Sequence, residues 1–314
     1  MTTTVGAVTT GMAWVDDQRF VMGSDAFYPE ERPAHEAEVT GFWIDRNPVT
    51  NVDFAEFVAD AGYLTVAERM PSAQDYPGAA AEALVPGSLV FQPTSGPVDL
   101  RDYFAWWRYV PGACWHLPAG PGSSLEGLAQ HPVVHVAYAD AIAYADWAGK
   151  ALPTEQEWEC AARGGREDSA YAWGDEPFPQ GMALANTWQG RFPWENLTLD
   201  GYERTSPVGA FPPNEYGLLD MIGNVWEWTA SPFRSHADPA RDDAATPRSC
   251  CTPRREPAAA EVTRLAAAGM RAVKGGSHLC VPNYCLRYRP AARQPQTVDT
   301  STGHLGFRCV ARTG

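Results

Sequence analysis

The sequence predicts one α+β domain built from a few helices, short antiparallel strands and much irregular structure. A hydrophobic fraction of 45% in 314 residues is sufficient for a sizeable core. The 12 tryptophans, 28 glycines and 27 prolines are typical of a loop-rich chain in which large aromatic side chains supply the packing. Neither a fixed repeat nor a linker divides the chain, so we expect a tail at residues 1–11 and one domain at residues 12–314.

Short strands are expected at residues 12–23 and 38–45, where apolar runs end at turn-forming residues. Residues 65–130 are rich in Pro, Gly, Ala and Asp, and we expect long ordered loops there. Loops of this length are uncommon unless they are functional. Residues 133–136 have strand character, and from residue 166 onward the pattern favours turns and short strands.

Three helices are expected, each with a recognisable start or stop. The first follows Thr50, a candidate N-cap, and stops at Gly62. The second covers about residues 140–148 and ends before a glycine. The third begins at the capping box of residues 154–157 and runs to Arg163, before a pair of glycines.

The charge and the termini limit the partners and the compartment. The net charge of −14 and the lack of a basic stripe argue against a nucleic-acid partner. No apolar run is long enough to span a membrane, so no membrane association is expected. The N-terminus lacks the regions of a signal peptide, which favours a cytoplasmic location. Thiols stay mostly reduced there, and an odd total of seven cysteines fits free or metal-binding thiols better than a disulfide framework.

The centre of the sequence is the stretch 274–290, which holds two cysteines five residues apart. Gly275 and Gly276 precede them and permit a sharp turn or a close approach of the backbone to a bound group. Cys280 and Cys285 on one short loop form a half-site for a soft metal ion, or a dithiol that cycles through a disulfide. A structural disulfide or two buried thiols is the alternative, since Cys-x4-Cys is not a standard zinc signature.

Other potential ligands are interpreted as structural. Cys114 and Cys160 are expected to be buried small apolar residues, and Cys309 to lie in the final strand. His131 and His135 have the spacing of two ligands on one helix face. The intervening Pro-Val-Val favours extended chain, in which the two imidazoles do not converge, so a structural role is expected.

Two polar stretches have the composition of a hard-cation site. One runs between Asn186 and Asp200, and the other from Asp220 to Glu227. In both, side-chain oxygens alternate with turn-forming backbone whose carbonyls can point inward, and Ca²⁺ requires about six to eight such oxygens. Asn and Asp residues that stabilise turns are the alternative interpretation, because neither stretch is an EF-hand.

Six motifs occur in a recognisable order. They are Pro-Thr-Glu-Gln-Glu-Trp-Glu at 153–159, Ala-Asn-Thr-Trp-Gln-Gly at 185–190, Gly-Asn-Val-Trp-Glu-Trp at 223–228, Gly-Gly-Ser at 275–277, Tyr-Cys-x-Arg-Tyr-Arg at 284–289 and Gly-Phe-Arg-Cys at 306–309. Together they resemble the formylglycine-generating enzymes of the sulfatase-modifying-factor family, from about residue 22 to residue 312. The resemblance implies a compact variant of the C-type-lectin fold with little regular structure, in agreement with the α+β expectation.

The family oxidises one cysteine of an unfolded sulfatase segment, within Cys-x-Pro-x-Arg, to Cα-formylglycine with O₂. The resemblance implies that Cys280 and Cys285 form the active pair and hold Cu(I), a soft ion that favours thiolates. Ser277 matches the family's active-site serine and would orient oxygen or a proton. The substrate groove would be lined by Tyr284, Trp106, Trp107, Phe211 and His304.

The resemblance also implies two structural Ca²⁺ ions. The ligands of the first would be Asn186, the Thr187 carbonyl, Asp200 and the Tyr202 carbonyl. The ligands of the second would be Asp220, the Gly223 carbonyl, the Val225 carbonyl and Glu227. These positions fall in the two oxygen-rich stretches described above.

Some positions depart from the family's common pattern. They are residues 281–283 between the cysteines, His278 and His304. All three changes surround the cysteine pair or the groove, so we expect them to affect rate and substrate range more than the reaction.

Two rival functions use the same fold. One is a non-haem iron enzyme like the ergothioneine-pathway sulfoxide synthases, which carry a His-x3-His-x-Glu motif. Here Ala137 stands two residues after His135, where that motif has its glutamate. The other rival is a non-catalytic ligand-binding module, since fold does not fix function. Retention of both cysteines argues against the module.

The chain also contains the motif that the family modifies. Residues 251–255 read Cys-Thr-Pro-Arg-Arg, in a polar stretch expected to be an exposed loop. Chance is one explanation in a segment rich in Pro and Arg. The other is that this loop acts as a weak mimic of the substrate.

Overall fold

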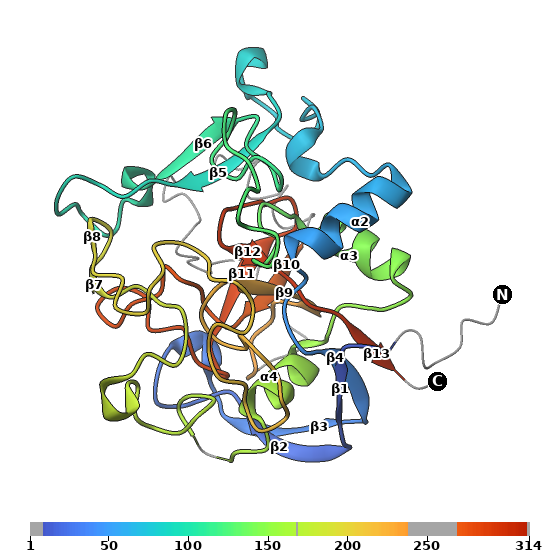
Figure 1. Cartoon of the computed structure of the whole chain (residues 1–314), viewed down its shortest axis with the longest axis vertical. Helices are drawn as coiled ribbons and strands as arrows, with labels where there is room; N and C mark the ends of the chain where they lie inside the picture. The colour runs from blue at the N-terminus through green and yellow to red at the C-terminus, as the bar shows by residue number, and fades with distance from the viewer. Residues whose placement is uncertain (1–8, 168, 238–268, 313–314) are drawn as a thin grey trace.

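The computed structural model of the chain describes residues 9–167, 169–237 and 269–312 (Figure 1). The Cys-x-Pro-x-Arg sequence at residues 251–255 lies outside the described residues. Within the described ranges, short strands and three α-helices are joined by long segments without regular structure, as the sequence predicts.

A four-stranded sheet lies at the centre of the structure, with the strand order β11-β10-β9-β12 (Figure 1). Its strands are β9 (Trp226–Pro232), β10 (Met270–Lys274), β11 (Arg293–Thr297) and β12 (Leu305–Gly306). β10 pairs antiparallel with β9 and β11, whereas β12 runs parallel to β9. β10 ends at Lys274 and β11 begins at Arg293, so the loop with the two cysteines connects two neighbouring strands of this sheet.

The first and last described strands meet in a second sheet. It has the order β1-β4-β13, with β1 (Met12–Val15), β4 (Phe42–Asp45) and β13 (Val310–Arg312). Phe42 and Ile44 of the central strand are fully buried, because alternate residues of a strand point to the same face. Strands from the two ends of the described chain, β1 and β13, therefore flank β4 on its two sides.

Three two-stranded hairpins contain the remaining strands. They are β2 (Gln18–Met22) with β3 (His35–Val39), β5 (Gly87–Phe91) with β6 (Trp107–Pro111), and β7 (Gly190–Arg191) with β8 (Glu195–Asn196). The strands expected at residues 12–23 and 38–45 are confirmed, as parts of β1 to β4. Short 3₁₀ turns lie between the strands, at η1 (Pro29–Glu31) and η5 (Pro179–Gly181).

Two local predictions are wrong. Residues 65–130 are not loops alone, since they contain β5 and β6 as well as three 3₁₀ turns, η2 (Val66–Glu68), η3 (Ala81–Ala83) and η4 (Tyr103–Ala105). A long connection separates β5 from β6, so no short turn signal marks this hairpin in the sequence. Residues 133–136 do not form a strand, because His135 adopts a left-handed φ of 61° that interrupts the extended chain.

The three expected helices are present, as α2 (Asn51–Ala61), α3 (Tyr138–Trp147) and α4 (Glu155–Arg163). Thr50 caps α2 at its N-terminus, and Gly62 ends it in the left-handed conformation. Thr154 and Glu157 form the expected capping box of α4. α3 begins two residues before the expected start, and it ends one residue earlier.

Three clusters of buried apolar side chains fill the space between these elements. The largest joins α2 and α3 to the central sheet, with Phe54 and Tyr144 stacked at 6.0 Å. The second packs Trp158 and Cys160 of α4 against β1 and β4. The third lies against the cysteine loop, and its aromatic members are Phe91, Tyr103, Trp106, Trp107, Trp188 and Phe192.

Ion pairs with little exposure hold both ends of the cysteine loop. They are Lys274–Glu159, Arg287–Glu30, Arg289–Glu31 and Arg293–Glu155. Glu155 also lies 3.7 Å from Lys274, so one carboxylate of α4 contacts the last residue of β10 and the first residue of β11. Burial opposes the ionisation of Glu155, but the charges of Arg293 and Lys274 prevail and lower its pKa to about 2.

We predict that Glu155→Gln lowers the free energy of unfolding by about 3–5 kcal/mol, because it leaves Arg293 buried without a carboxylate. Urea unfolding of the variant and the parent at neutral pH measures the loss. Glu38→Gln is the matched control. Its pair with Arg19 is largely exposed, so the expected cost is within about 0.5 kcal/mol. Equal effects of the two substitutions would contradict the role of Glu155.

The pKa of Glu155 also implies a pH dependence of stability. Its folded-state value of about 2 lies below the ordinary 4.5, so its stabilisation is complete above pH 4.5 and is lost as the pH falls toward 2. We predict that the free energy of unfolding falls more steeply over this window for the parent than for Glu155→Gln. Denaturant titrations across the window provide the measurement, and parallel slopes would count against the assignment.

Candidate active site

The cysteine loop leaves β10 through two glycines in the left-handed region, Gly275 at φ 91° and Gly276 at φ 73°. A Cβ on Gly275 would lie 2.9 Å from the Met221 carbonyl oxygen and 3.0 Å from the Trp158 ring. A Cβ on Gly276 would lie 2.6 Å from the carbonyl oxygen of Arg287, on the returning half of the loop. The loop therefore packs against α4 and closes on itself only because both side chains are absent.

The sulfur atoms of Cys280 and Cys285 lie 3.3 Å apart, and both side chains are buried. The Cys285 N–H donates to the Val281 carbonyl at 2.8 Å, which folds the loop so that the two thiols meet. The Ser277 N–H donates to the Cys280 sulfur at 3.3 Å. A disulfide bond measures about 2.05 Å, so the loop holds two thiols and not a disulfide.

Burial and the neighbouring charges together set the protonation of Cys280. Burial, reinforced by the neighbouring Cys285 thiol, raises the pKa of Cys280 well above that of an ordinary cysteine. Arg287 acts in the opposite direction, and its guanidinium lies 3.8 Å from the Cys285 sulfur. Glu30 pairs with Arg287, and the Tyr28 ring lies 3.8 Å from the guanidinium carbon. The raised pKa of Cys280 favours its thiol form, and a bound cation would favour the thiolate.

The two thiols border a small pocket with aromatic walls. The pocket is lined by Trp106, Trp107, Phe192, Ser277, Leu279, Cys280, Tyr284, Cys285 and His304. The Tyr284 and Phe192 rings stack at 4.6 Å, and Trp106 meets Tyr284 edge-on at 5.6 Å. The His304 ring lies 4.9 Å from the Trp107 ring. The structure therefore brings together every predicted catalytic and groove residue except Phe211.

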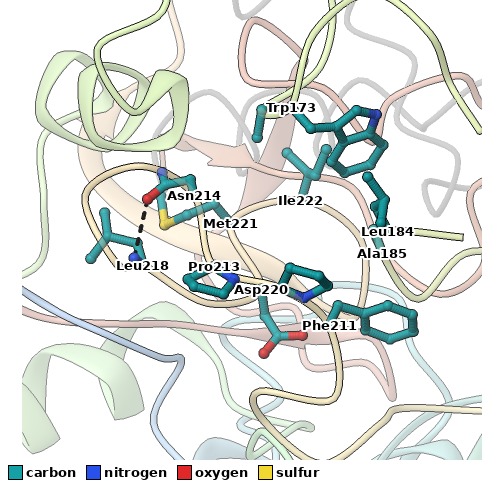
Figure 2. Close-up of a pocket in the computed structure, with 12 residues that line it drawn as sticks. Trp173, Leu184, Ala185, Phe211, Pro213, Asn214, Leu218, Asp220, Met221 and Ile222 are labelled. Carbon is teal, nitrogen blue, oxygen red and sulfur yellow. Dashed lines mark hydrogen bonds between the residues drawn. The ribbon is translucent and has the colours of Figure 1, made fainter. Parts of the chain in front are cut away.

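Phe211 lies in a different pocket (Figure 2). Its neighbours there include Trp173, Asp220 and Ile222, so the structure gives no support for a place in the groove beside the cysteines. Phe192 occupies such a place and was not predicted. The feature of the sequence that could have indicated this position is an aromatic residue beside a proline, in the short segment between β7 and β8.

The first predicted calcium set comes together in one loop cluster. The Asp200 carboxylate accepts from the N–H groups of Thr187 and Tyr202, both at 3.0 Å. The side-chain oxygen of Asn186 is buried without a hydrogen-bond partner, while its amide nitrogen donates to the Arg204 carbonyl at 2.8 Å. The Asp200 carboxylate also accepts from the Gln189 amide nitrogen at 2.8 Å, so the feature of this set that fits a hard cation is the buried Asn186 oxygen without a donor.

The second predicted set does not fit calcium. Both Glu227 oxygens accept from the Arg308 guanidinium at 2.7 Å, and one also accepts from the Trp158 indole at 2.8 Å. Arg308 therefore already compensates this buried carboxylate. One Asp220 oxygen accepts from the Asn224 amide at 3.3 Å. The second calcium site therefore stays a prediction.

His131 and His135 do not share a site. The His131 ring lies 3.0 Å from the Thr205 hydroxyl. The His135 ring contacts the Ser88 hydroxyl at 2.8 Å and the Pro118 carbonyl at 2.9 Å. The two rings therefore hold different loops in place, which is the structural role expected from the sequence.

Three further cysteines are buried, and the sequence predicts this burial for Cys114 and Cys160. Cys160 and Cys309 belong to the apolar clusters, although Cys309 lies directly before β13 and not in it. Cys114 has a polar neighbour, since its sulfur lies 3.4 Å from the imidazole of His116. The prediction of an inert apolar residue is therefore incomplete for Cys114.

The family model of the sulfatase-modifying factor enzyme 1-like domain matches residues 2–313. The chain belongs to this family. It is 56% identical to the formylglycine-generating enzyme of Mycobacterium tuberculosis, over 93% of this chain and 94% of that protein. It is 43% identical to the formylglycine-generating enzyme of Thermomonospora curvata, over 97% of this chain and 94% of that protein. The predicted resemblance is confirmed.

The family also contains a protein named for its lack of activity. The chain is 39% identical to the inactive Cα-formylglycine-generating enzyme 2 of Mus musculus, over 94% of this chain and 84% of that protein. Among solved structures, PvdO from Pseudomonas aeruginosa superposes with a TM-score of 0.59 at 22% identity, over 96% of this chain and 94% of that chain. This likeness confirms the predicted single-domain, loop-rich fold. None of the described helices is long and apolar enough to cross a membrane.

We predict that Gly275→Ala lowers the free energy of unfolding by about 2–5 kcal/mol, the sum of left-handed backbone strain and a steric clash. Gly122→Ala is a matched control. Gly122 has the same φ of 91° but nothing within 4 Å of an added Cβ, so only the strain of about 1–2 kcal/mol remains. Denaturant unfolding of the two variants gives the difference. Similar costs would show that the close packing around Gly275 is unimportant.

Proposed function

We propose that this protein is a copper-dependent oxidase that uses O₂ to convert the cysteine of a Cys-x-Pro-x-Arg segment, in an unfolded sulfatase, to Cα-formylglycine. The observation that carries the proposal is the pair of buried thiols, 3.3 Å apart, beside an aromatic pocket. Support also comes from 56% identity to a protein named formylglycine-generating enzyme.

Cys280 and Cys285 are the residues that would hold Cu(I). Two adjacent sulfurs suit a soft metal, and none of the described residues that line the pocket is a carboxylate. When bound, the ion supplies a soft site for the substrate sulfur and the redox chemistry that activates O₂. Arg287 keeps a positive charge beside the pair and thereby favours release of the thiol protons when a metal binds.

The remaining pocket residues orient the substrate and exclude water. The Ser277 hydroxyl oxygen accepts from the Leu279 N–H at 3.3 Å, so its hydrogen is available for donation to oxygen or to a substrate group. Trp106 and Tyr284 shield the sulfurs from water, which strengthens electrostatic interactions in the pocket. The net charge of −14 favours the approach of the substrate arginine.

The electron balance of the reaction requires a reductant. Conversion of a CH₂–SH group to an aldehyde, with the sulfur leaving as H₂S, releases two electrons. Reduction of O₂ to water takes four, so two thiols supply the other two electrons and form a disulfide. The activity assay therefore contains the peptide, Cu(I), O₂ and a small thiol, and mass spectrometry detects the aldehyde.

We predict that Cys280→Ser and Cys285→Ser each reduce oxidation of a Cys-x-Pro-x-Arg peptide to the uncatalysed background, while the protein stays folded. Both sulfurs are needed to bind the soft ion in the pocket. Cys160→Ser is the control. Cys160 belongs to the apolar cluster that packs α4 against β1 and β4, so this substitution should leave turnover near that of the parent. Near-normal turnover in either pocket variant, with copper present, would refute the proposal.

The iron-dependent rival receives no comparable support. His131 and His135 contact different partners, so they do not provide the paired histidines that such a site needs. A purely binding function predicts neither copper uptake nor peptide oxidation. Running the same assay with Fe(II) in place of Cu(I), and with no metal, separates the three possibilities.

We also propose one structural Ca²⁺ on the first predicted set, for which the unpartnered Asn186 oxygen is the main support. We predict that calcium near 100-fold its Kd raises the Tm of the parent by about 5 °C. Asp200→Asn should abolish this response, because the ion loses its carboxylate ligand. Asp99→Asn is the control, since Asp99 belongs to an exposed ion pair. An Asp200→Asn protein that responds to calcium like the parent would remove the site.

A further inference from the structure

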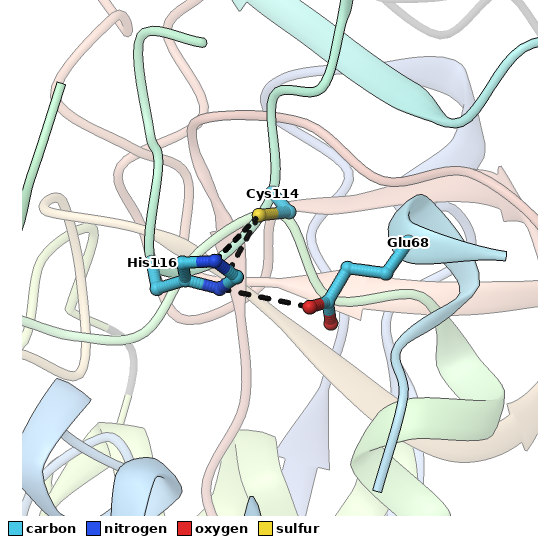
Figure 3. A group of neighbouring side chains, drawn as sticks. All are labelled: Glu68, Cys114 and His116. Atoms are coloured by element: carbon cyan, nitrogen blue, oxygen red, sulfur yellow. Dashed lines mark hydrogen bonds and ion pairs between the residues drawn. The ribbon is translucent and has the colours of Figure 1, made fainter. Parts of the chain in front are cut away.

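We propose that Glu68, Cys114 and His116 form a second metal site, one that takes Zn²⁺ (Figure 3). One carboxylate oxygen, the thiol sulfur and one imidazole nitrogen all lie within 4.8 Å of one another. Within the described ranges, no other three His, Cys, Asp or Glu residues bring their ligand atoms this close. None of the three lines the pocket of the cysteine pair, so this inference is independent of the proposed oxidase function.

Two of the three separations between the ligand atoms match those of tetrahedral zinc. Zinc bonds of about 2.0–2.3 Å to sulfur, nitrogen and oxygen, at tetrahedral angles, place neighbouring ligand atoms about 3.3–3.7 Å apart. The Nδ1 atom of His116 lies 3.4 Å from the Cys114 sulfur and 3.6 Å from a Glu68 oxygen. Both separations therefore fall in the range that a bound ion requires.

Hydrogen bonds around the three side chains preorganise them. One Glu68 oxygen accepts from the backbone N–H and the hydroxyl of Thr65, at 3.0 and 2.6 Å, which turns the other oxygen toward His116. Cys114 and Leu117 exchange backbone hydrogen bonds of 3.3 and 3.1 Å, and this tight turn presents the sulfur and the imidazole on one side. Hydrogen bonds of this kind fix the orientation of metal ligands and raise affinity.

The donor set favours zinc over the other metals discussed. Sulfur, imidazole nitrogen and carboxylate oxygen are each common zinc ligands. Ca²⁺ takes oxygen ligands, and Cu(I) favours sulfur. The His116 side chain is 43% exposed, so water reaches the fourth position of a three-ligand site.

The same side chains do not form a Cys–His–Glu catalytic relay. In such a relay, one ring nitrogen contacts the nucleophile and the other contacts the carboxylate. Here Nδ1 of His116 is the ring nitrogen nearest the Cys114 sulfur, and it also faces Glu68. Burial raises the pKa of Cys114, and the Glu68 charge adds to the effect, so the thiol is not activated without a cation.

Zinc at this site joins η2 to the turn that follows β6. β6 begins at Trp107, which lines the pocket of the cysteine pair. The ion therefore links η2 to the segment that follows β6, the strand whose first residue lines that pocket.

Zinc uptake by the metal-free, full-length chain tests the proposal. Competition with a chromophoric chelator gives the number of Zn²⁺ equivalents and their affinities. Compared with the parent, Cys114→Ser and His116→Gln should each lose one equivalent. Glu68→Gln should weaken that equivalent at least tenfold, although Gln can still accept from Thr65. With Co²⁺ as the probe, the cobalt–thiolate absorption should decrease in Cys114→Ser.

The controls keep the result decisive. Cys280 and Cys285 are retained in every variant, so any zinc that they bind is common to all proteins compared. Cys160→Ser should match the parent in equivalents and affinity. His116→Gln changes a half-exposed side chain and is expected to fold, which thermal unfolding verifies. Unchanged zinc stoichiometry and affinity in folded His116→Gln would overturn the proposal, as would loss of the equivalent in Cys114→Ser alone.

Discussion

The Glu155 carboxylate is the interaction on which the candidate site depends. Lys274 and Arg293 stand directly opposite each other in the β10–β11 pair, where two cations repel. Glu155 lies 2.6 Å from Arg293 and 3.7 Å from Lys274, and Glu159 lies 2.9 Å from Lys274, so two carboxylates of α4 compensate the two charges. The cysteine loop starts immediately after Lys274 and returns to the sheet at Arg293. The strand pair at the base of the loop therefore depends on two buried carboxylates of α4, of which Glu155 contacts both cations.

Buried ion pairs of this kind add little net stability, because desolvation offsets most of the attraction. We infer that these ion pairs select one conformation of the loop. Each buried cation is compensated only in the conformation that brings it to its carboxylate. The Arg287–Glu30 and Arg289–Glu31 ion pairs act in the same way on the part of the loop that follows Cys285. A loop held at both ends keeps the two thiols in contact and under aromatic walls from distant parts of the chain.

Local sequence signals predicted the features that depend on residues close together in the chain. Thr50 and the capping box at residues 154–157 mark two helix starts, and the spacing of the two cysteines marks the site. What the sequence did not reveal depends on contacts between distant segments. β5 and β6 pair across a long connection, and Phe192 reaches the pocket from another hairpin. Phe211 was assigned to the groove by resemblance alone, and its side chain lies in a different pocket.

The most direct test of whether the cysteine pair is the metal centre is X-ray absorption at the copper edge. The protein is loaded with one equivalent of Cu(I). We predict a first shell made of sulfur, contributed by Cys280 and Cys285, because the sulfurs lie 3.3 Å apart and no carboxylate lines the described pocket. The Cys285→Ser protein should lose one sulfur from that shell. A shell of nitrogen and oxygen in the parent, or an unchanged shell in Cys285→Ser, would contradict the assignment of the copper site.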